Sequence, residues 1–172
     1  IVAVTKGHPP AAVTAAIEAG LGDVGENRVQ EALAKQEALG DAPVRWHLIG
    51  SLQRNKVRHA VGRFATIQSV DRIELVSELN RRIVPPARQR VLVEVNCSGE
   101  PQKGGVEPGE AEALVAAVRE SPVLEFGGLM TMAALTDDER IQRAAFGRLR
   151  SLKERLEAAG VAVPDLSMGM SG

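Results

Sequence analysis

The chain has 172 residues, of which 44% are hydrophobic and 25% are charged, as in an ordinary globular protein with a sizeable core. The formal net charge is −1, no block of like charge occurs and no apolar run reaches the ~20 residues of a membrane span, so neither nucleic acid nor a membrane is expected as a partner. A single cysteine, Cys97, excludes an internal disulfide and favours a reducing, cytoplasmic location.

Short apolar runs typical of buried strands alternate along the chain with amphipathic segments typical of helices. Proline and glycine mark several helix ends: Pro9 and Pro10 precede the first helix, and Gly20 and Gly40 follow the first two. In chain order, the expected strands are 1–4, 23–25, 44–49, 64–70, 90–96, 124–130 and 163–168. The expected helices between them are 11–19, 29–39, 55–61, 73–83, 110–120 and 137–159.

Uninterrupted alternation of strand and helix predicts an α/β fold, with a parallel sheet and crossover helices. Seven such units favour a (β/α)8 TIM-like barrel over a doubly wound sheet, since no Gly-x-Gly-x-x-Gly motif follows the first strand. The chain begins inside a strand without an initiator methionine and stops just after another apolar segment. We therefore expect a single domain, residues 1–172, that is one unit short of a full barrel and truncated at both ends.

Candidate site residues follow the carboxyl ends of the expected strands, which in a barrel converge on one face. Lys6 stands out because an amine held at the end of a buried strand can condense with an aldehyde. The segment Gly169–Ser171 stands out because backbone N–H groups and a serine hydroxyl in such a turn can cradle a phosphate. Together they predict a ligand with an aldehyde at one end and a phosphate at the other. The full set of strand-end residues is Lys6, Asn27, Gly50–Ser51, Asp71, Asn96–Ser98, Met130–Thr131 and Gly169–Ser171.

Several of these positions have a structural explanation that competes with a functional one. Asn27 and Asp71 precede expected helices, where each could serve as the N-cap. His47, inside the third strand, is expected to be a hydrogen-bonded histidine of the core or rim rather than a catalyst. The three histidines are too scattered to ligate a metal together, and no serine stands in a Gly-x-Ser-x-Gly motif. The sequence therefore favours neither metal catalysis nor a serine nucleophile.

Five segments, in the right order and spread over essentially the whole chain, resemble the pyridoxal phosphate homeostasis protein family. This family is also called the YggS family or the proline synthase co-transcribed homologues. The eleven-residue length of one segment makes the resemblance specific. The segments are Ala3–Lys6, Gly25–Glu31, Trp46–Lys56, Gly127–Met130 and Ser167–Ser171.

The resemblance implies a barrel like the N-terminal domain of alanine racemase, with pyridoxal 5′-phosphate held as a Schiff base on Lys6. By matching position, Asn27 would lie beside the cofactor, and Met170 and Ser171 would belong to the phosphate-binding loop. The family's last strand, with an arginine facing the pyridine nitrogen, would lie beyond Gly172, so these 172 residues alone are expected to retain the cofactor weakly. The resemblance also implies a monomer that supplies the cofactor to apo-enzymes and balances vitamin B6 and amino-acid pools without turnover of its own.

A pyridoxal phosphate-dependent enzyme, such as an amino-acid racemase, is the alternative. By analogy with alanine racemases, racemisation on this scaffold needs acid–base groups on both faces of the substrate, namely the lysine and a tyrosine from another domain. The chain has no tyrosine and no room for a second domain, which favours the carrier. A Schiff-base aldolase would also use a barrel lysine, but the sequence shows no evident proton relay beside it.

Overall fold

The computed structural model describes residues 1–100 and 103–170, in which seven strands form one sheet in the order β1 to β7. Every neighbouring pair of strands is parallel. A strand order that follows the chain without reversal is typical of a barrel wall, whereas a doubly wound sheet reverses at a switch point. The strands are β1 (Ala3–Val4), β2 (Asp23–Glu26), β3 (Arg45–Leu48), β4 (Thr66–Val70), β5 (Gln89–Glu94), β6 (Leu124–Ala133) and β7 (Asp165–Met170).

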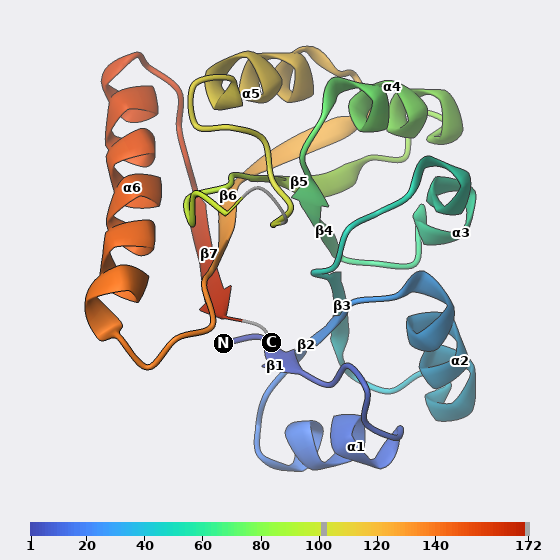
Figure 1. The fold of residues 1–172 in the computed structure, drawn as a ribbon. Helices are drawn as coiled ribbons and strands as arrows, with labels where there is room; N and C mark the ends of the chain where they lie inside the picture. Colours follow the sequence, from blue (N-terminus) through green and yellow to red (C-terminus); the bar gives the residue numbers. More distant parts are fainter. Residues whose placement is uncertain (101–102, 171–172) are drawn as a thin grey trace.

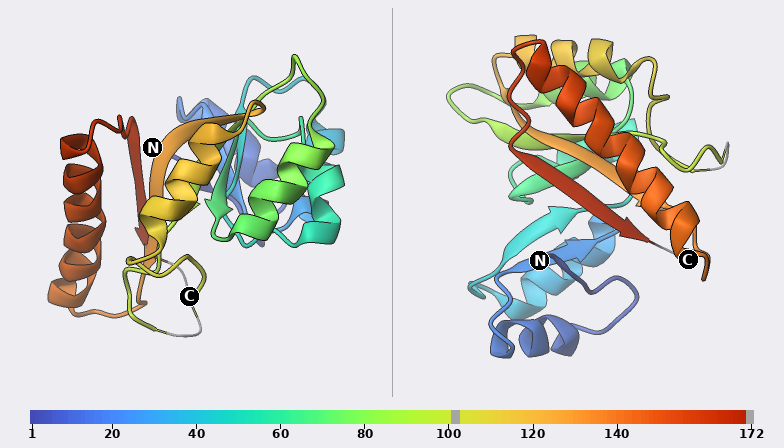
Figure 2. Two further views of the ribbon diagram at one scale, coloured as in Figure 1. Left: turned by 90° about the horizontal axis from the view of Figure 1, so that it is seen from above. Right: turned by 90° about the vertical axis from the view of Figure 1, so that its left-hand side faces the viewer.

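Helices connect successive strands and lie outside the curved sheet (Figure 1). The longest of those described, α6, lies along β6 and β7 on the outer face (Figure 2). The alternation predicted from the sequence is therefore confirmed, with the third helical segment divided into a 3-10 turn and a single α-helical turn. The helices are α1 (Ala11–Glu18), α2 (Val29–Leu39), η1 (Arg54–Lys56), α3 (Val57–Ala60), α4 (Ile73–Arg82), α5 (Ala111–Glu120) and α6 (Glu139–Ala158).

Alternation along each strand separates two environments. In β5, Val91 and Val93 are fully buried in the core between the sheet and the helices, whereas Arg90 and Leu92 line a cavity on the inner face. The outer core also holds the apolar sides of the helices, such as Leu79 of α4. Because burying each such side chain contributes about 1.5–3 kcal/mol, this outer layer stabilises the fold and leaves the inner face free for polar groups.

A bulge in β6 decides which of its side chains face the inner cavity. Val91 and Leu92 of β5 pair with Phe126 and Gly128, so Gly127 is an extra residue in β6. Before the bulge, Phe126 packs against the outer core, whereas Met130 and Met132 line the cavity after it. An extra residue switches the side-chain alternation of a strand, which is why these even-numbered residues lie on opposite faces.

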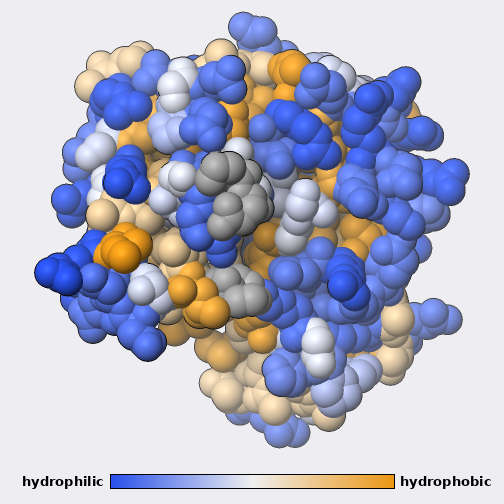
Figure 3. Space-filling view, viewed as in Figure 1, coloured by the Kyte–Doolittle hydropathy of each residue, from blue (hydrophilic) through white to orange (hydrophobic). Residues whose placement is uncertain are grey.

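The face of the molecule seen in Figure 3 is mostly hydrophilic, with hydrophobic residues interspersed among the hydrophilic ones. Val4 of β1 and Met168 and Met170 of β7 are among the exposed hydrophobic residues. In the part of the chain that the structure describes, we find no helix that combines the length and the apolar character needed to cross a membrane.

Candidate functional site

The curved sheet encloses a cavity of about 710 Å³ that is lined by inward-facing side chains. Ligand pockets in proteins commonly have volumes of about 300–1,000 Å³, so the cavity could hold a small cofactor. Residues from all seven strands contribute to its wall, which makes the inner face of the sheet the candidate site. Among them are Val4, His47, Gln68, Leu92, Met132 and Ser167.

Lys6 lies in the turn that follows the carboxyl end of β1, but the expectation that this strand is buried was wrong: β1 is an edge strand of the described sheet, and Val4 is 51% exposed. The side chain of Lys6 is half-buried, and the residues that line the cavity include Val2 and Val4 but not Lys6 itself. The backbone N–H of Thr5 donates to the carbonyl of Gly25 at 3.1 Å, so pairing with β2 continues up to the residue before Lys6. The strand pairing therefore fixes the backbone immediately before Lys6.

A buried ion pair lies directly behind this strand end. Lys35 of α2 donates a 2.6 Å hydrogen bond to Oε1 of Glu26 and a 2.8 Å bond to the backbone carbonyl of Thr5. The Thr5 hydroxyl also donates to Oε1 of Glu26, at 2.5 Å. Glu26 is fully buried, and its Oε2 atom has no hydrogen-bond partner among the described residues. These contacts tie the ends of β1 and β2 to α2 just before Lys6.

Sequence reasoning missed Lys35 and Glu26 because lysine and glutamate are usually surface residues. A signal was nevertheless present, since Lys35 lies three residues after Ala32 and six after Val29, both of which are buried on one face of α2. A lysine on the buried side of a helix needs an anionic partner, and the partner here is supplied by the strand that precedes the helix.

Asn27 lies at the end of β2, next to the strand that carries Lys6. Val4 pairs with Gly25, so Lys6 and Asn27 each stand two residues beyond that pair. A Cβ atom at Gly50 would lie 2.4 Å from the carbonyl oxygen of Asn27, so glycine there allows the end of β3 to approach Asn27 closely. The N-cap position of α2 is held by Arg28, without a side-chain capping bond, so Asn27 is not the N-cap of this helix.

Asp71 does not cap the helix that follows it, because Arg72 occupies the N-cap position of α4. That expectation was wrong because Asp71 forms an ion pair with Arg72 instead, and Arg72 also donates a 2.8 Å bond to the carbonyl of Leu52.

Glu94, at the end of β5, is buried near this ion pair. Burial, and after it the charge of Asp71, raise the pKa of Glu94 to about 7 against the opposing charge of Arg72.

The end of β7 differs from the expected turn. Gly169 and Met170 belong to the strand itself, with Met170 paired to Ala133 of β6, whereas the sequence predicted a turn from Gly169 onward. Gly169 and Met170 both line the cavity, and Met170 is 47% exposed. Ser171, the other predicted phosphate-binding residue, lies outside the described residues.

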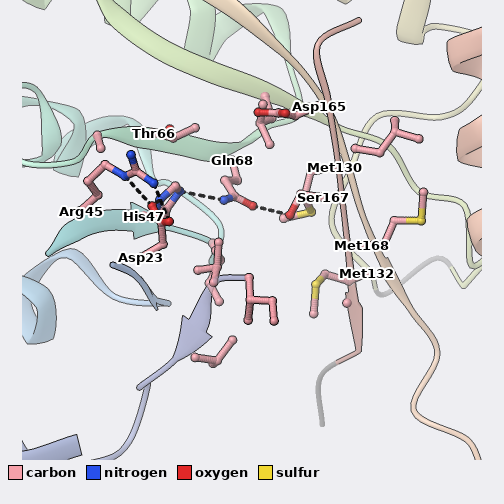
Figure 4. A pocket seen from close by; sticks show the side chains of 18 of the residues that line it. Asp23, Arg45, His47, Thr66, Gln68, Met130, Met132, Asp165, Ser167 and Met168 are labelled. Carbon is pink, nitrogen blue, oxygen red and sulfur yellow. Dashed lines mark hydrogen bonds and ion pairs between the residues drawn. The ribbon is translucent and has the colours of Figure 1, made fainter. Parts of the chain in front are cut away.

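A hydrogen-bonded network crosses the inner cavity from β2 to β7 (Figure 4). The Arg45 guanidinium donates two hydrogen bonds of 2.7 Å to the Asp23 carboxylate, and His47 Nε2 lies 2.8 Å from the same carboxylate. Gln68 joins His47 Nδ1, at 3.0 Å, to the hydroxyl of Ser167, at 2.6 Å. The Arg45 guanidinium and then His47 hold the pKa of Asp23 well below its usual range, despite the opposing effect of burial. His47 is hydrogen-bonded, as expected, and its side chain lines the cavity rather than lying in the core.

Metal ligation finds no support in the described ranges 1–100 and 103–170, which bring together no group of three or more His, Cys, Asp or Glu side chains suited to a metal ion. The carboxylates at the described strand ends, Glu26, Asp71 and Glu94, are not gathered into such a group, and the strand ends also contribute an amine, an amide and small residues. This set suits an organic ligand better than a cation.

Comparisons with known proteins place the chain in a family. The family described as the alanine racemase N-terminal domain matches residues 1–172. The chain is also 42% identical to the pyridoxal phosphate homeostasis protein of Pseudomonas aeruginosa, over 99% of this chain and 74% of that protein. The chain belongs to the pyridoxal phosphate homeostasis protein family. Its relative of the same name in Aquifex aeolicus is likewise 42% identical, over 97% of this chain and 74% of that protein.

Solved structures confirm the predicted fold. PipY of Synechococcus elongatus with pyridoxal phosphate bound is 34% identical and superposes with a TM-score of 0.81, over 99% of this chain and 81% of that chain. PipY without the cofactor is 32% identical, with a TM-score of 0.87 over 98% of this chain and 88% of that chain. Alanine racemase of Bacillus anthracis is 18% identical and has a TM-score of 0.78, over 97% of this chain and 44% of that chain, which shows a shared fold.

Proposed function

We propose that this protein binds pyridoxal 5′-phosphate at the carboxyl ends of its strands, as a Schiff base on Lys6, and serves vitamin B6 and amino-acid homeostasis. The observation that carries the proposal is that half-buried Lys6 and Asn27 follow the carboxyl ends of the neighbouring strands β1 and β2, each two residues beyond the Val4–Gly25 pair. The bound cofactor in PipY, which is 34% identical, supports it.

The residues present fit this cofactor. Lys6 supplies the amine that an aldehyde requires, Asn27 supplies a neutral hydrogen-bonding side chain beside it, and the cavity is large enough for the pyridine ring. Gly169 lines the cavity beside Met132 at the end of β7. Met170 and Ser171 are then the residues proposed to hold the phosphate, through backbone N–H groups and the serine hydroxyl.

Pyridoxal phosphate supplies an aldehyde, with which an amine condenses by forming a carbon–nitrogen double bond and releasing one water. The chain's part is to hold the amine in place. Lys35 does so from behind, because its bond to the Thr5 carbonyl fixes the backbone next to Lys6. Lys35 is itself held by its ion pair with the buried Glu26 carboxylate. The contact between α2 and the ends of β1 and β2 therefore supports the backbone next to Lys6.

A carrier role is favoured over catalysis of racemisation. A racemase of the alanine racemase type uses a tyrosine as its second acid–base group, and the sequence contains no tyrosine. The names of the relatives, pyridoxal phosphate homeostasis proteins, also support a homeostatic role. In this role the protein would act as a cytoplasmic monomer that supplies the cofactor to apo-enzymes.

The test is to mix the protein with pyridoxal phosphate, record the visible spectrum, reduce with borohydride and map the modified lysine. We expect an absorbance band and an adduct on Lys6, both lost in Lys6→Ala and both retained in the control Lys56→Ala. An adduct spread over several surface amines, with no loss in Lys6→Ala, would overturn the proposed site. Incubation of the loaded protein with L-alanine tests the carrier role separately, and formation of D-alanine would contradict it.

A further inference from the structure

The network across the cavity has a defined direction. The Ser167 hydroxyl donates to Oε1 of Gln68, which leaves Nε2 of Gln68 to donate to His47 Nδ1. With Nδ1 accepting, the ring proton lies on Nε2 and points at the Asp23 carboxylate. Reversing the Gln68 amide would require the proton on Nδ1, and the lone pair of Nε2 would then face an anion. The observed direction therefore satisfies every contact with a neutral imidazole.

This network links the amino-terminal end of β2, through β3 and β4, to β7 close to the proposed phosphate site. Asp23 begins β2, whose far end carries Asn27, and Ser167 lies in β7, three residues before Met170. Through the backbone, β2 and β7 are linked only by way of the intervening strands of the described sheet. Small differences in strand twist accumulate over such a path, so a direct link across the cavity defines the separation better than the sheet alone.

The link is well placed to be rigid. Gln68 is 3% exposed, and the Arg45–Asp23 pair holds the other end of the network in one geometry. A second contact across the inner face joins Arg90 of β5 to Asp165 of β7 at 2.9 Å. Two inward-facing residues of β7 are therefore bonded across the cavity, Asp165 to β5 and Ser167 to β4. The next residue of β7 that lines the cavity on the same face is Gly169.

We propose that Ser167, Gln68 and His47 form a positioning relay that holds β7 against β4 and β3, fixes the position of the Met170 end of β7, and thereby strengthens the hold on the cofactor phosphate. The relay rests on the proposed function and refines it. None of its members contacts the reacting atoms, so they are positioning residues. Their effect is specific to a ligand that carries a phosphate.

Two ligands separate positioning from general stability: pyridoxal phosphate, and pyridoxal, which has the aldehyde but no phosphate. In Ser167→Ala we expect the affinity for pyridoxal phosphate to fall about five-fold, which is the change expected from the loss of one hydrogen bond. The affinity for pyridoxal should be unchanged. Ser167→Thr keeps the hydroxyl and should restore the affinity. The matched control is Ser77→Ala, which removes an exposed serine hydroxyl bonded to the Ile73 carbonyl in α4.

A double-mutant cycle tests whether Ser167 acts through Gln68. If it does, Ser167→Ala combined with Gln68→Leu should bind pyridoxal phosphate no more weakly than Gln68→Leu alone, and additive losses would overturn the relay. Thermal unfolding of each variant identifies any that fails to fold, and Ser167→Thr then remains the decisive comparison. Unchanged affinity in Ser167→Ala, or equal losses for both ligands, would overturn the relay alone. A wild-type protein that binds neither ligand would overturn the proposed function and the relay with it.

Discussion

Replacing Lys35 with methionine tests the support behind Lys6. The change keeps the length of the side chain but removes the ammonium, leaving the fully buried Glu26 carboxylate without its 2.6 Å partner. Because Oε2 of Glu26 already has no hydrogen-bond partner in the described chain, little remains to compensate the charge. Breaking a buried ion pair in this way typically costs about 3–5 kcal/mol, so we expect the free energy of unfolding to fall by that amount.

The measurement is urea denaturation of the wild type, Lys35→Met and the double variant Lys35→Met/Glu26→Gln. The double variant removes both charges, so it should recover a large part of the loss. The control is Arg143→Met in α6, where an exposed arginine lies 3.2 Å from Glu139 and the expected cost is below about 1 kcal/mol. A cost below about 1 kcal/mol in Lys35→Met, or a double variant no more stable than the single one, would refute the reasoning.

We expect the stability of the protein to depend on pH through Glu94, because the pKa of this residue in the folded state, about 7, lies above the usual 4.5. Between these values the folded protein binds the extra proton, so stability should fall by up to about 3 kcal/mol as the pH rises from 4.5 to 8. Urea denaturation at several pH values should show that Glu94→Gln removes this part of the dependence. Gly50→Ala should destabilise the protein by about 1–3 kcal/mol and weaken cofactor binding, since its Cβ would overlap the Asn27 carbonyl. Gly147→Ala in α6, where a Cβ meets no atom within 4 Å, should instead stabilise by about 0.5–1 kcal/mol.

Each of these expectations has a contrary result. An unchanged slope of stability against pH in Glu94→Gln would show that another group titrates in that range. Equal stability of Gly50→Ala and the wild type would show that the end of β3 can move away from Asn27 without cost. Destabilisation by Gly147→Ala would contradict the open space around that position.

The sequence alone determined the order of elements, the barrel fold and the place of the central candidate residues. Periodicity of apolar residues and the glycine and proline residues at helix ends are local signals, and they placed α2 at residues 29–39 as observed. The place of Lys6 followed from the end of the first apolar run, and that of Asn27 from the end of the second. In a parallel sheet with an unbroken strand order, such ends necessarily lie on one face.

Only the tertiary structure decided which polar residues meet. Ser167 and Gln68 are 99 positions apart and touch because the sheet curves until β7 faces β4. Lys35 pairs with Glu26 because the α2 crossover returns over the strand before it. The bulge at Gly127 changed which side chains of β6 point toward the cavity. Pairing with β6, up to Ala133, extended β7 through Gly169 and Met170. These outcomes depend on distant backbone pairing and on the satisfaction of buried charges, neither of which leaves a local pattern in the sequence.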